Sequence, residues 1–585
     1  MRSKSFLSLL LVLLLTLNSL PAVFAEDTDV FNVGDLKCRL LSDGTIEIAG
    51  RRRSFNFTGK SYTIPDVIDG KKVTSIGERA FRDEYFSSLT IPDGITSIGK
   101  EAFRNCDQLR SVYIADSVTT ISVAAFFDCY HLESVSLPNG ITSIDDYTFA
   151  ECPNLRDITI PEGVISIGSY AFNNCNALTN VTLPKSLNFI KSSAFANCWQ
   201  LCSINLPSQV VCIGSSAFAG TGLQSISLPS SVQEIDEFAF DTKKLQNITI
   251  SGYIAWLNSN AFYIHYDIPM LITMPITMLP SISSAVHSDS TMIWYQLSIP
   301  ADYHLSSSEF DFINGHYVTC IVDSNHPTLE SIDGVLFSRE DHCLLSYSLR
   351  SGTSYAIPDG TLAISEHAFN IQSVENITIP DSVAAIACDA FIGNSAMKSF
   401  TVSPTHSIFA DINGVLFNKT EKSLIAFPCN YNDSSRYSIG YEVPNGINSI
   451  NSYAFANTAH LSWVAVPDSV TSIGAYAFAN SSSLASITLP ESITAIEAGT
   501  FTDCENLSSV NIPGNTTSIG ECAFQNCTSL TSLTIPSSVT LIGENAFKDC
   551  TALTLTVTRN SYAADYAKSN NISYAFTDAN DWLNN

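Results

Sequence analysis

Two short patterns of apolar and polar residues alternate along most of the chain. In the first, LRDITIP at 155–161, Leu155, Ile158 and Ile160 are placed to point inward. Ile158 and Ile160 alternate with polar residues, as in a half-buried strand. Pro161 has no N–H to donate to a neighbouring strand, so it ends the segment. The pattern predicts a short strand.

The second pattern follows directly, as VISIGSYAF at 164–172. Its first residues predict another short extended stretch. Gly168 predicts a turn, and the remaining residues are expected to form a short helical turn that places Phe172 in the interior. Each repeat therefore contributes two extended segments joined by turns.

The phenylalanine that closes the second pattern recurs with a fixed period. Within each of two series the step is 22 or 23 residues, apart from one insertion. The series are Phe81, Phe103, Phe126, Phe149, Phe172, Phe195, Phe218, Phe240 and Phe262, and then Phe369, Phe391, Phe455, Phe478, Phe501, Phe524 and Phe547. These sixteen units have the fixed period that is typical of a solenoid.

A unit of 22 or 23 residues is too small to bury its own apolar positions. Stacked units bury leucine on leucine, isoleucine on isoleucine and phenylalanine on phenylalanine. This predicts a repeat solenoid, α/β to mainly β in class, with a parallel strand ladder along one face. We call each unit a coil, and a set of equivalent positions in successive coils a column.

The repeat, LxxLxLPxxLxxIgxxAFxxC, resembles the leucine-rich repeats of the Treponema pallidum type, which occur in BspA-like bacterial surface proteins. The resemblance covers roughly residues 61–262 and 355–558. It implies a right-handed, curved leucine-rich repeat array, export from the cell, and often adhesion or host contact. It implies no particular ligand.

Both ends of the array carry segments that predict caps. SDGTIEIAG at 42–50 predicts a hairpin turn at its Asp-Gly pair and an alternating strand over the first coil. SYAADYAKSNNI at 561–572 has a helical pattern of Tyr562, Tyr566 and Ala567, and resembles the terminal helix of the family. Such polar caps cover the ends of an open solenoid, whose unpaired strands and exposed apolar residues would otherwise associate with other chains.

The first 25 residues have the three parts of a secretory signal peptide. Two basic residues precede the apolar run at 6–15, and small residues follow at 22–25. Cleavage after Ala25 is expected to export the mature protein to the medium or the cell surface. A second apolar stretch, 266–286, contains three prolines that would remove backbone donors where lipid offers no replacement. No membrane span is therefore expected in the mature chain.

The periodicity is interrupted between residues 263 and 320. This segment holds four of the six methionines, Met270, Met274, Met278 and Met292. One interpretation is a run of degenerate coils in which flexible methionines fill irregular gaps. The other is a protruding, adaptable binding element, since long irregular segments of compact proteins are often functional.

Two related segments, SIDGVLFS at 331–338 and DINGVLFN at 411–418, predict β-hairpins inserted between coils. Each centres on an Asp-Gly or Asn-Gly pair flanked by apolar residues, which is a strong hairpin signal. The expected organisation is a signal peptide at 1–25, an N-terminal β cap at 26–60, a first repeat array at 61–262, an irregular insert and hairpin at 263–354, a second array at 355–558 with a hairpin around 402–440, and a C-terminal cap at 559–585.

The formal net charge of -27 repels nucleic-acid phosphates and anionic lipid headgroups, so neither is an expected partner. Only 15% of the residues are charged, whereas Ser, Thr and Asn are abundant. The surface is therefore expected to consist mainly of neutral polar groups, which favours an extracellular protein.

Cysteines recur with the period of the repeat, at Cys106, Cys129, Cys152, Cys175 and Cys198, and again at Cys504, Cys527 and Cys550. A column spacing of about 4.8 Å lies within the Cα separation of about 4.4–6.8 Å that a disulfide allows. Thr221, Thr458 and Ser481 stand at the same place in other coils, so the position needs a small side chain and not sulfur. We expect buried, reduced structural cysteines despite an oxidising destination. One thiol per coil along a line gives no tetrahedral metal site.

Motifs for catalysis are missing. The ten histidines form no pair at metal or triad spacing, and there is no HExxH, GxSxG or glycine-rich phosphate loop. His326 and His406 each precede a predicted hairpin, where loop polarity explains them more simply than catalysis does. We expect no enzyme activity, no catalytic residue, no cofactor and no metal.

The outward residues of the predicted strands are almost all Ser, Thr or Asn. They suit either a solvated sheet whose polar groups bond along the ladder, or weak multivalent contact with a hydroxyl-rich ligand. Typical hot-spot residues are nearly absent from this face. The candidate ligand contacts are Tyr113, Asp157, Thr159, Trp199 and Trp463.

These features favour a secreted or cell-surface binding protein, adhesin-like and without catalysis. Its expected partner is an extracellular protein or glycan of a host or of neighbouring cells. The alternative is a structural spacer whose solenoid displays the central insert. 

Overall fold

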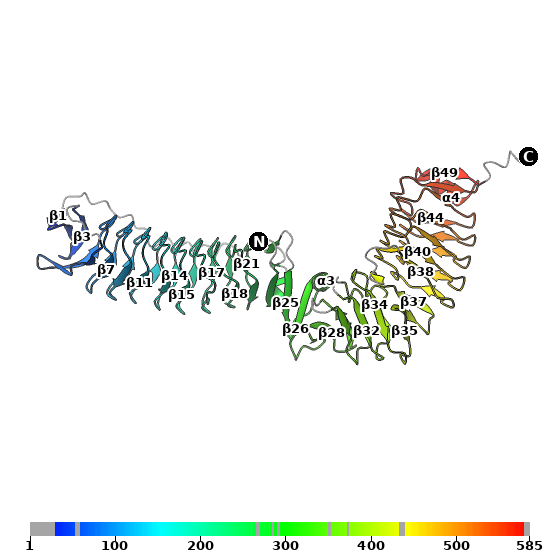
Figure 1. Cartoon of the computed structure of the whole chain (residues 1–585), viewed down its shortest axis with the longest axis horizontal. Helices are drawn as coiled ribbons and strands as arrows, with labels where there is room; N and C mark the ends of the chain where they lie inside the picture. The colour runs from blue at the N-terminus through cyan, green and yellow to red at the C-terminus, as the bar shows by residue number, and fades with distance from the viewer. Residues whose placement is uncertain are drawn as a thin grey trace, which may run out of the picture. The chain divides into compact units, whose positions relative to one another are not determined.

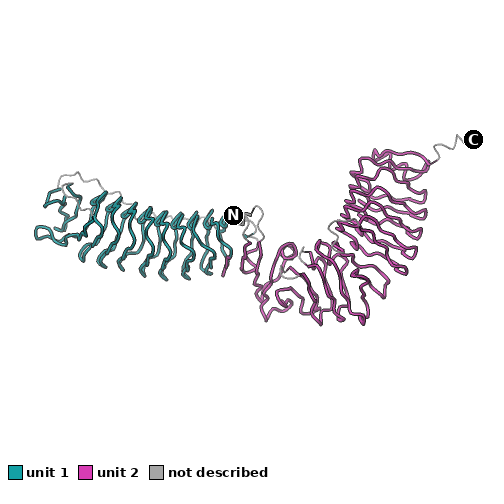
Figure 2. Tube along the Cα trace, in the orientation of Figure 1, with its two compact units in different colours: residues 1–246, 252–268, 281–290 teal, residues 247–251, 269–280, 291–585 magenta. Residues whose placement is uncertain are grey.

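A computed structural model of the chain describes residues 30–52, 59–258, 260–264, 269–279, 281–282, 286–288, 293–348, 353–370, 374–431 and 439–577. The expected signal peptide at 1–25 lies outside these residues. The chain divides into two compact units (Figure 2). Unit 1 comprises residues 1–246, 252–268 and 281–290, and unit 2 comprises residues 247–251, 269–280 and 291–585.

In unit 1 successive coils contribute short strands that pair in parallel as two ladders (Figure 1). The first ladder consists of β4 (Ser61–Thr63), β7 (Ser88–Ile91), β9 (Ser111–Ile114), β11 (Ser134–Ser136), β13 (Asp157–Thr159) and β15 (Asn180–Thr182), with β18 (Ser225–Leu228) in a later coil. The second consists of β6 (Lys71–Ile76), β8 (Ser97–Ile98), β10 (Thr120–Ile121), β12 (Ser143–Ile144), β14 (Ser166–Ile167), β16 (Phe189–Ile190), β17 (Cys212–Ile213), β19 (Glu234–Ile235) and β21 (Trp256–Leu257). The parallel strand ladder predicted from the two apolar patterns is confirmed.

The N-terminal cap of unit 1 is an antiparallel meander that joins the second ladder. It contains β1 (Val30–Val33), β2 (Leu36–Leu40) and β3 (Ile46–Arg51). β3 then pairs in parallel with β6, and β5 (Val67–Ile68) pairs antiparallel with β6. The side chains of β3 alternate between buried and half-buried, because one face covers the first coil. This agrees with the predicted hairpin and cap.

The segment between 263 and 320 continues the ladder in its described part. β20 (Asn247–Ile250), β23 (Met270–Pro275), β25 (Ile293–Ile299) and β26 (Tyr317–Val322) pair in parallel in unit 2, with α3 (Ser307–Gly315) before the last strand. A 3-10 turn, η1 (Ile276–Met278), follows β23, and β22 (Phe262–Ile264) pairs with β24 (Val286–Ser288) in unit 1. Met270, Met274 and Met278 are buried. Methionine takes places of the usual leucine and isoleucine in the coil of β23, so the regular pattern is lost there while the stacking is kept, as the degenerate-coil interpretation expects.

The rest of unit 2 repeats the two-ladder plan. One side contains β30 (Ser354–Ala356), β32 (Asn376–Ile379), β34 (Ser399–Val402), β38 (Ile439–Glu442), β40 (Leu461–Ala465), β42 (Ser486–Thr488), β44 (Ser509–Val510), β46 (Ser532–Thr534), β48 (Thr554–Val557) and β49 (Ser573–Phe576). The other contains β31 (Ala363–Ile364), β33 (Ala385–Ile386), β39 (Ser449–Ile450), β41 (Ser472–Ile473), β43 (Ala495–Ile496), β45 (Ser518–Ile519) and β47 (Leu541–Ile542).

The two predicted hairpins are present. β27 (Leu329–Ile332) pairs antiparallel with β28 (Val335–Ser338), and β35 (Phe409–Ile412) with β36 (Val415–Asn418). In both turns the Asp-Gly or Asn-Gly pair has positive φ at both residues, as a two-residue hairpin requires. A third strand, β29 (Cys343–Ser346) or β37 (Ser423–Ala426), connects each hairpin to the ladder.

Phenylalanine rings stack through the core of each unit. From Phe81 to Phe262 the centroids of successive rings are 5.2–5.6 Å apart and the rings are within 12° of parallel. In unit 2, Tyr347 stacks on Phe369 and Phe427 stacks on Phe455. These two rings extend the phenylalanine column into the hairpin coils.

The segment around each core phenylalanine is a series of tight turns and not the short helical turn expected. Tyr170 and Asn174 flank Phe172 and have φ of 59° and 60°. These left-handed residues on both sides direct every second backbone N–H group toward the next coil. The N–H groups of Tyr170, Phe172 and Asn174 donate to the carbonyl oxygens of Ser192, Ala194 and Ala196, respectively, at 2.8–2.9 Å. Hydrogen bonds between coils therefore replace those that a helix would make within itself.

The predicted terminal helix is present as α4 (Tyr562–Ser569). The Ser561 side chain caps its first turn by accepting from Ala564, and Ala563 and Ala567 are buried against the last coil. β49 then adds a final parallel strand to β48. 

Candidate functional site

Tyr113 stands on the outer face of the first ladder of unit 1, which we call the strand face. Its side chain is 54% exposed. The register pairs Tyr113 with Thr90 on one side and Ser136 on the other. Because β13 continues the same register, Thr159 stands two coils from Tyr113 in this column, at about 10 Å for two strand spacings.

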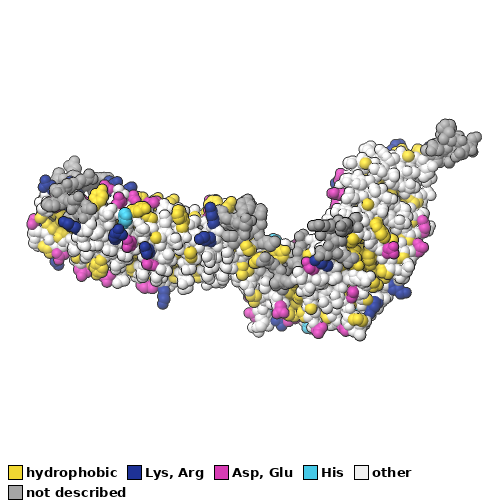
Figure 3. Space-filling view, in the orientation of Figure 1, with side chains coloured by type: hydrophobic (Ala, Val, Ile, Leu, Met, Phe, Trp, Pro, Cys, Tyr) yellow, Lys and Arg dark blue, Asp and Glu magenta, His cyan; other side chains and the backbone are white. Residues whose placement is uncertain are grey.

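Asp157 belongs to the neighbouring column of the strand face, beside Ser134 and Asn180. The Asn180 amide donates a hydrogen bond to the Asp157 carboxylate. In unit 2 the Ser399 hydroxyl makes the same kind of contact with the Asn376 amide oxygen, at 2.7 Å. Polar side chains thus bond along the ladder at these pairs and still present exposed groups to solvent. On the side displayed in Figure 3, neutral polar side chains and backbone cover most of the surface and charges are scattered.

Trp463 is an exposed aromatic residue on the outer face of unit 2, whereas the other four candidates lie in unit 1. Its indole lies over Gly440 on the neighbouring strand: a Cβ at Gly440 would stand 1.9 Å from the ring. The side chain is 42% exposed. Part of this tryptophan therefore packs on its own ladder, and the rest faces solvent.

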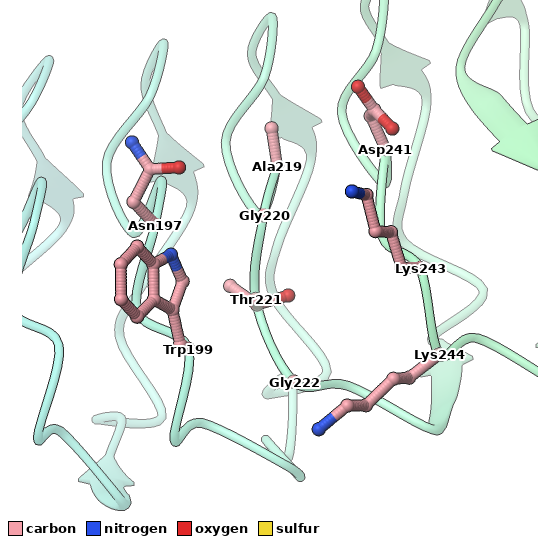
Figure 4. A pocket seen from close by; sticks show the side chains of 9 residues that line it. All are labelled: Asn197, Trp199, Ala219, Gly220, Thr221, Gly222, Asp241, Lys243 and Lys244. Carbon is pink, nitrogen blue, oxygen red and sulfur yellow. The ribbon is translucent and has the colours of Figure 1, made fainter. Parts of the chain in front are cut away.

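Trp199 lies away from the strand face, in the turn after Cys198, and is 61% exposed. It borders an open hollow of about 520 Å³ in unit 1 (Figure 4). The other lining residues include Asn197, Gly220, Lys243 and Lys244. Sequence reasoning identified Trp199 but not these neighbours. The sequence feature that could have indicated these neighbours is the turn after Phe218, which is rich in glycine and one residue shorter than the turn after Phe195.

Seven of the eight periodic cysteines are buried, as expected, Cys550 is half-buried, and all eight are free thiols. Each donates to the carbonyl oxygen of the phenylalanine in the preceding coil, for example Cys175 to Phe149 at 3.1 Å. Ser481 makes the same contact with Phe455 at 2.8 Å. Burial raises the pKa of Cys152 and Cys175 well above the usual range, which keeps them as thiols and not nucleophilic thiolates.

His326 and His406 are structural parts of the two hairpins. The Nδ1 atom of His326 accepts from the N–H of Leu329 at 3.0 Å, and Nδ1 of His406 accepts from Phe409 at 3.1 Å. Both rings are buried. Each ring therefore holds the start of a hairpin strand, which agrees with a structural role in the loop.

Among the described residues, no group of three or more His, Cys, Asp or Glu side chains could hold a metal ion. The helices in the described part of the chain are all too short or too polar to cross a membrane.

The model of the BspA-type leucine-rich repeat region matches residues 74–202, 142–269, 188–291, 346–439 and 436–554. These matches cover most of both arrays. A search of curated proteins finds no match to the chain.

Several solved structures are similar to the chain. A leucine-rich cell surface protein from Faecalibacterium prausnitzii is 24% identical, over 94% of this chain and 99% of that chain, with a TM-score of 0.29. A leucine-rich repeat protein from Bacteroides ovatus is 20% identical, over 90% and 99%, with a TM-score of 0.30. The T. pallidum leucine-rich repeat protein is 27% identical, over 32% of this chain and 88% of that chain, with a TM-score of 0.30.

Proposed function

Because the chain belongs to the BspA-type leucine-rich repeat family, we propose that it is a secreted or cell-surface binding protein, adhesin-like and without catalysis. Stacked repeats create long surfaces that are suited to protein contact. Its partner is an extracellular protein or glycan of a host or of neighbouring cells.

The observation that carries this proposal is the strand face of unit 1 around Tyr113. Thr90, Tyr113, Ser136 and Thr159 form one column of outward residues on adjacent strands. A rigid tyrosine among small hydroxyl side chains offers one anchor and many weak polar contacts. Contacts of this kind bind strongly only when many are made at once, which suits an immobilised partner such as matrix or mucin.

Export is the second part of the proposal. Residues 1–25 act as a signal peptide that is removed after Ala25. Expression of the full chain in a bacterial host, followed by separation of medium, cell wall and cytosol, tests this. Mass spectrometry of the exported protein should find Glu26 at its N-terminus. Full-length protein retained in the cytosol would contradict export.

Capture of partners tests binding itself. The mature protein is immobilised and exposed to host extracellular matrix, mucin and bacterial surface extracts. We expect a specific partner whose capture is reduced by Tyr113→Ala. Absence of a partner in every pool would favour the alternative, a structural spacer. In the central segment, β23, β25 and β26 are stacked in parallel.

A further inference from the structure

The hollow beside Trp199 arises from a local change in the repeat. From the core phenylalanine to the next inward leucine there are six steps in most coils of the first array, as from Phe195 to Leu201. In the next two coils the distance is five, from Phe218 to Leu223 and from Phe240 to Leu245. The first shortened turn contains Gly-Thr-Gly at 220–222, so a row of side chains is interrupted for one coil.

Glycine at both positions keeps the backbone close to the preceding coil. A Cβ at Gly222 would stand 2.5 Å from the main-chain oxygen of Trp199, and a Cβ at Gly220 would stand 2.6 Å from Oδ1 of Asn197. Gly222 is in the same column as Trp199 and Lys244, four residues after the core phenylalanine of its coil. The floor of the hollow is therefore backbone, and its two walls are one coil away on either side.

One wall of the hollow is the indole of Trp199 (Figure 4). The side chain is 61% exposed, which leaves much of its apolar ring in water. Asn197 lies beside it, and no hydrogen bond of its side chain is found within the described residues. At the equivalent place in unit 2, Asn480 donates to Asn457 at 3.0 Å. The hollow thus offers a flat apolar surface and an amide that is open to a ligand.

The opposite wall carries two ammonium groups. Lys243 and Lys244 extend from the next coil toward the glycine turn (Figure 4). Neither forms an ion pair with a described residue. The Asp241 carboxylate also lines this wall. In a chain with a net charge of -27, two exposed ammonium groups at the edge of one hollow favour an anionic ligand there.

We propose that this hollow binds one acidic sugar residue, carboxylated or sulfated, within a longer glycan. The inference rests on the proposed binding function and specifies which kind of glycan the protein binds. The C–H groups of a sugar ring stack on the electron-rich face of Trp199. The acidic group of the sugar pairs with Lys243 or Lys244, whose flexible ammonium groups suit a tetrahedral sulfate or a planar carboxylate.

A sugar also suits the Asn197 amide. Its hydroxyls both donate and accept hydrogen bonds, so they can pair with both the oxygen and the NH2 group of this side chain. A volume of about 520 Å³ lies within the range of small-molecule sites, about 300–1,000 Å³. The hollow is open toward solvent, as binding within a longer glycan chain requires.

Titration of the full mature chain with four soluble probes of matched length tests the class of ligand. The probes are a hyaluronan oligosaccharide (carboxylate only), a dextran sulfate fragment (sulfate only), a neutral dextran fragment and a glutamate oligomer. We expect binding to one or both acidic sugars that weakens as salt is added, because salt screens exposed charges. The first two probes distinguish a carboxylate from a sulfate site.

Variants then locate the site. Trp199→Ala is expected to weaken acidic-sugar binding about tenfold or more, as for other tryptophan anchors. Lys243→Gln with Lys244→Gln should cause a similar loss and remove the salt dependence. Gly220→Asn is a second route, because it fills the hollow while asparagine accepts the left-handed backbone that Asn174 and Asn197 already adopt.

Matched controls lie outside the hollow. Trp256, also 61% exposed, is changed to Ala, and the exposed pair Lys71 and Lys72 is changed to Gln; neither variant should alter binding. The proposal is overturned if neither acidic sugar binds, if neutral dextran binds equally well, or if the glutamate oligomer binds and depends on the same residues. It is also overturned if Trp199→Ala and Gly220→Asn both bind like the unmodified chain. None of these results would contradict the proposed binding function, which is tested separately by partner capture that depends on Tyr113.

Discussion

The thiol of Cys152 donates a hydrogen bond to the main-chain carbonyl oxygen of Phe126, 3.3 Å away in the preceding coil. The same contact recurs in coil after coil, and a serine hydroxyl makes it at Ser481. The column is therefore defined by a small buried donor, and sulfur is one way to provide it. Cysteine and serine can therefore both occupy this column, whereas Thr221 and Thr458 donate to the phenylalanine carbonyl of their own coil.

Two replacements of Cys152 distinguish the contribution of its hydrogen bond to stability from that of the sulfur atom. Cys152→Ser keeps a donor and is expected to change the free energy of unfolding little. Cys152→Ala leaves the buried carbonyl without this donor and is expected to cost about 1–3 kcal/mol. Equilibrium denaturation in urea measures both. Equal losses for the two variants would show that packing of the sulfur atom matters more than the hydrogen bond.

Thiol accessibility gives an independent check of the cysteine column. Cys202 is exposed, whereas Cys129, Cys152 and Cys175 are buried and burial raises the pKa of their thiols. Brief alkylation of the native protein should label Cys202 first, and Cys129, Cys152 and Cys175 only after denaturation. Mass spectrometry of the digested protein identifies the labelled sites. Disulfides between neighbouring column cysteines in protein purified from the medium would contradict the expected reduced state.

The contact of Trp463 with Gly440 is suited to a double-mutant cycle. Gly440→Ala places a methyl group against the indole and is expected to cost about 1–3 kcal/mol of the free energy of unfolding. In a Trp463→Ala background the same change should cost much less, because the ring is gone. A cost that is the same in both backgrounds would mean that Gly440 is required for its backbone alone.

The hairpin beginning at Phe409 should weaken in acid. Burial lowers the pKa of His406 below its ordinary 6.5, while nearby Asp381 opposes this and Lys419 adds to it. The unfolded chain therefore takes up the proton first as the pH falls. The contribution of His406 is complete above 6.5 and is lost as the pH falls toward its folded pKa. Protection of the Ile408 and Phe409 amides against hydrogen exchange should decrease between about pH 7 and pH 5, and should not do so in His406→Asn.

The fold was predictable because its strongest signal is periodic. Phe172 and its equivalents recur in the sequence at the spacing with which their rings stack in space. Tyr347 and Phe427 were not recognised from the sequence as members of the phenylalanine column, because hairpins separate them from the regular series. The coil that contains Met270 and Met274 was not recognised from the sequence, because methionine replaces the leucine and isoleucine that mark the repeat.

The binding surfaces were predictable only in part. Tyr113 and Trp463 were visible as aromatic exceptions among small polar residues. The underlying Gly440 was not, because its partner lies on another strand 23 residues away. The hollow beside Trp199 depends on a missing residue in the next coil and on lysines one coil further. Such a site exists only once the coils are aligned in space.

The central claim is that the strand face of unit 1 is the surface that contacts the partner. Tyr113 and Tyr130 allow a direct test, since both lie in unit 1 and are 54% and 53% exposed, but only Tyr113 is on a strand of that face. The affinity of Tyr113→Ala and of Tyr130→Ala for the captured partner is compared with that of the unmodified protein. We predict that Tyr113→Ala weakens binding about tenfold or more, while Tyr130→Ala has no effect. Equal affinities for all three proteins would contradict the account.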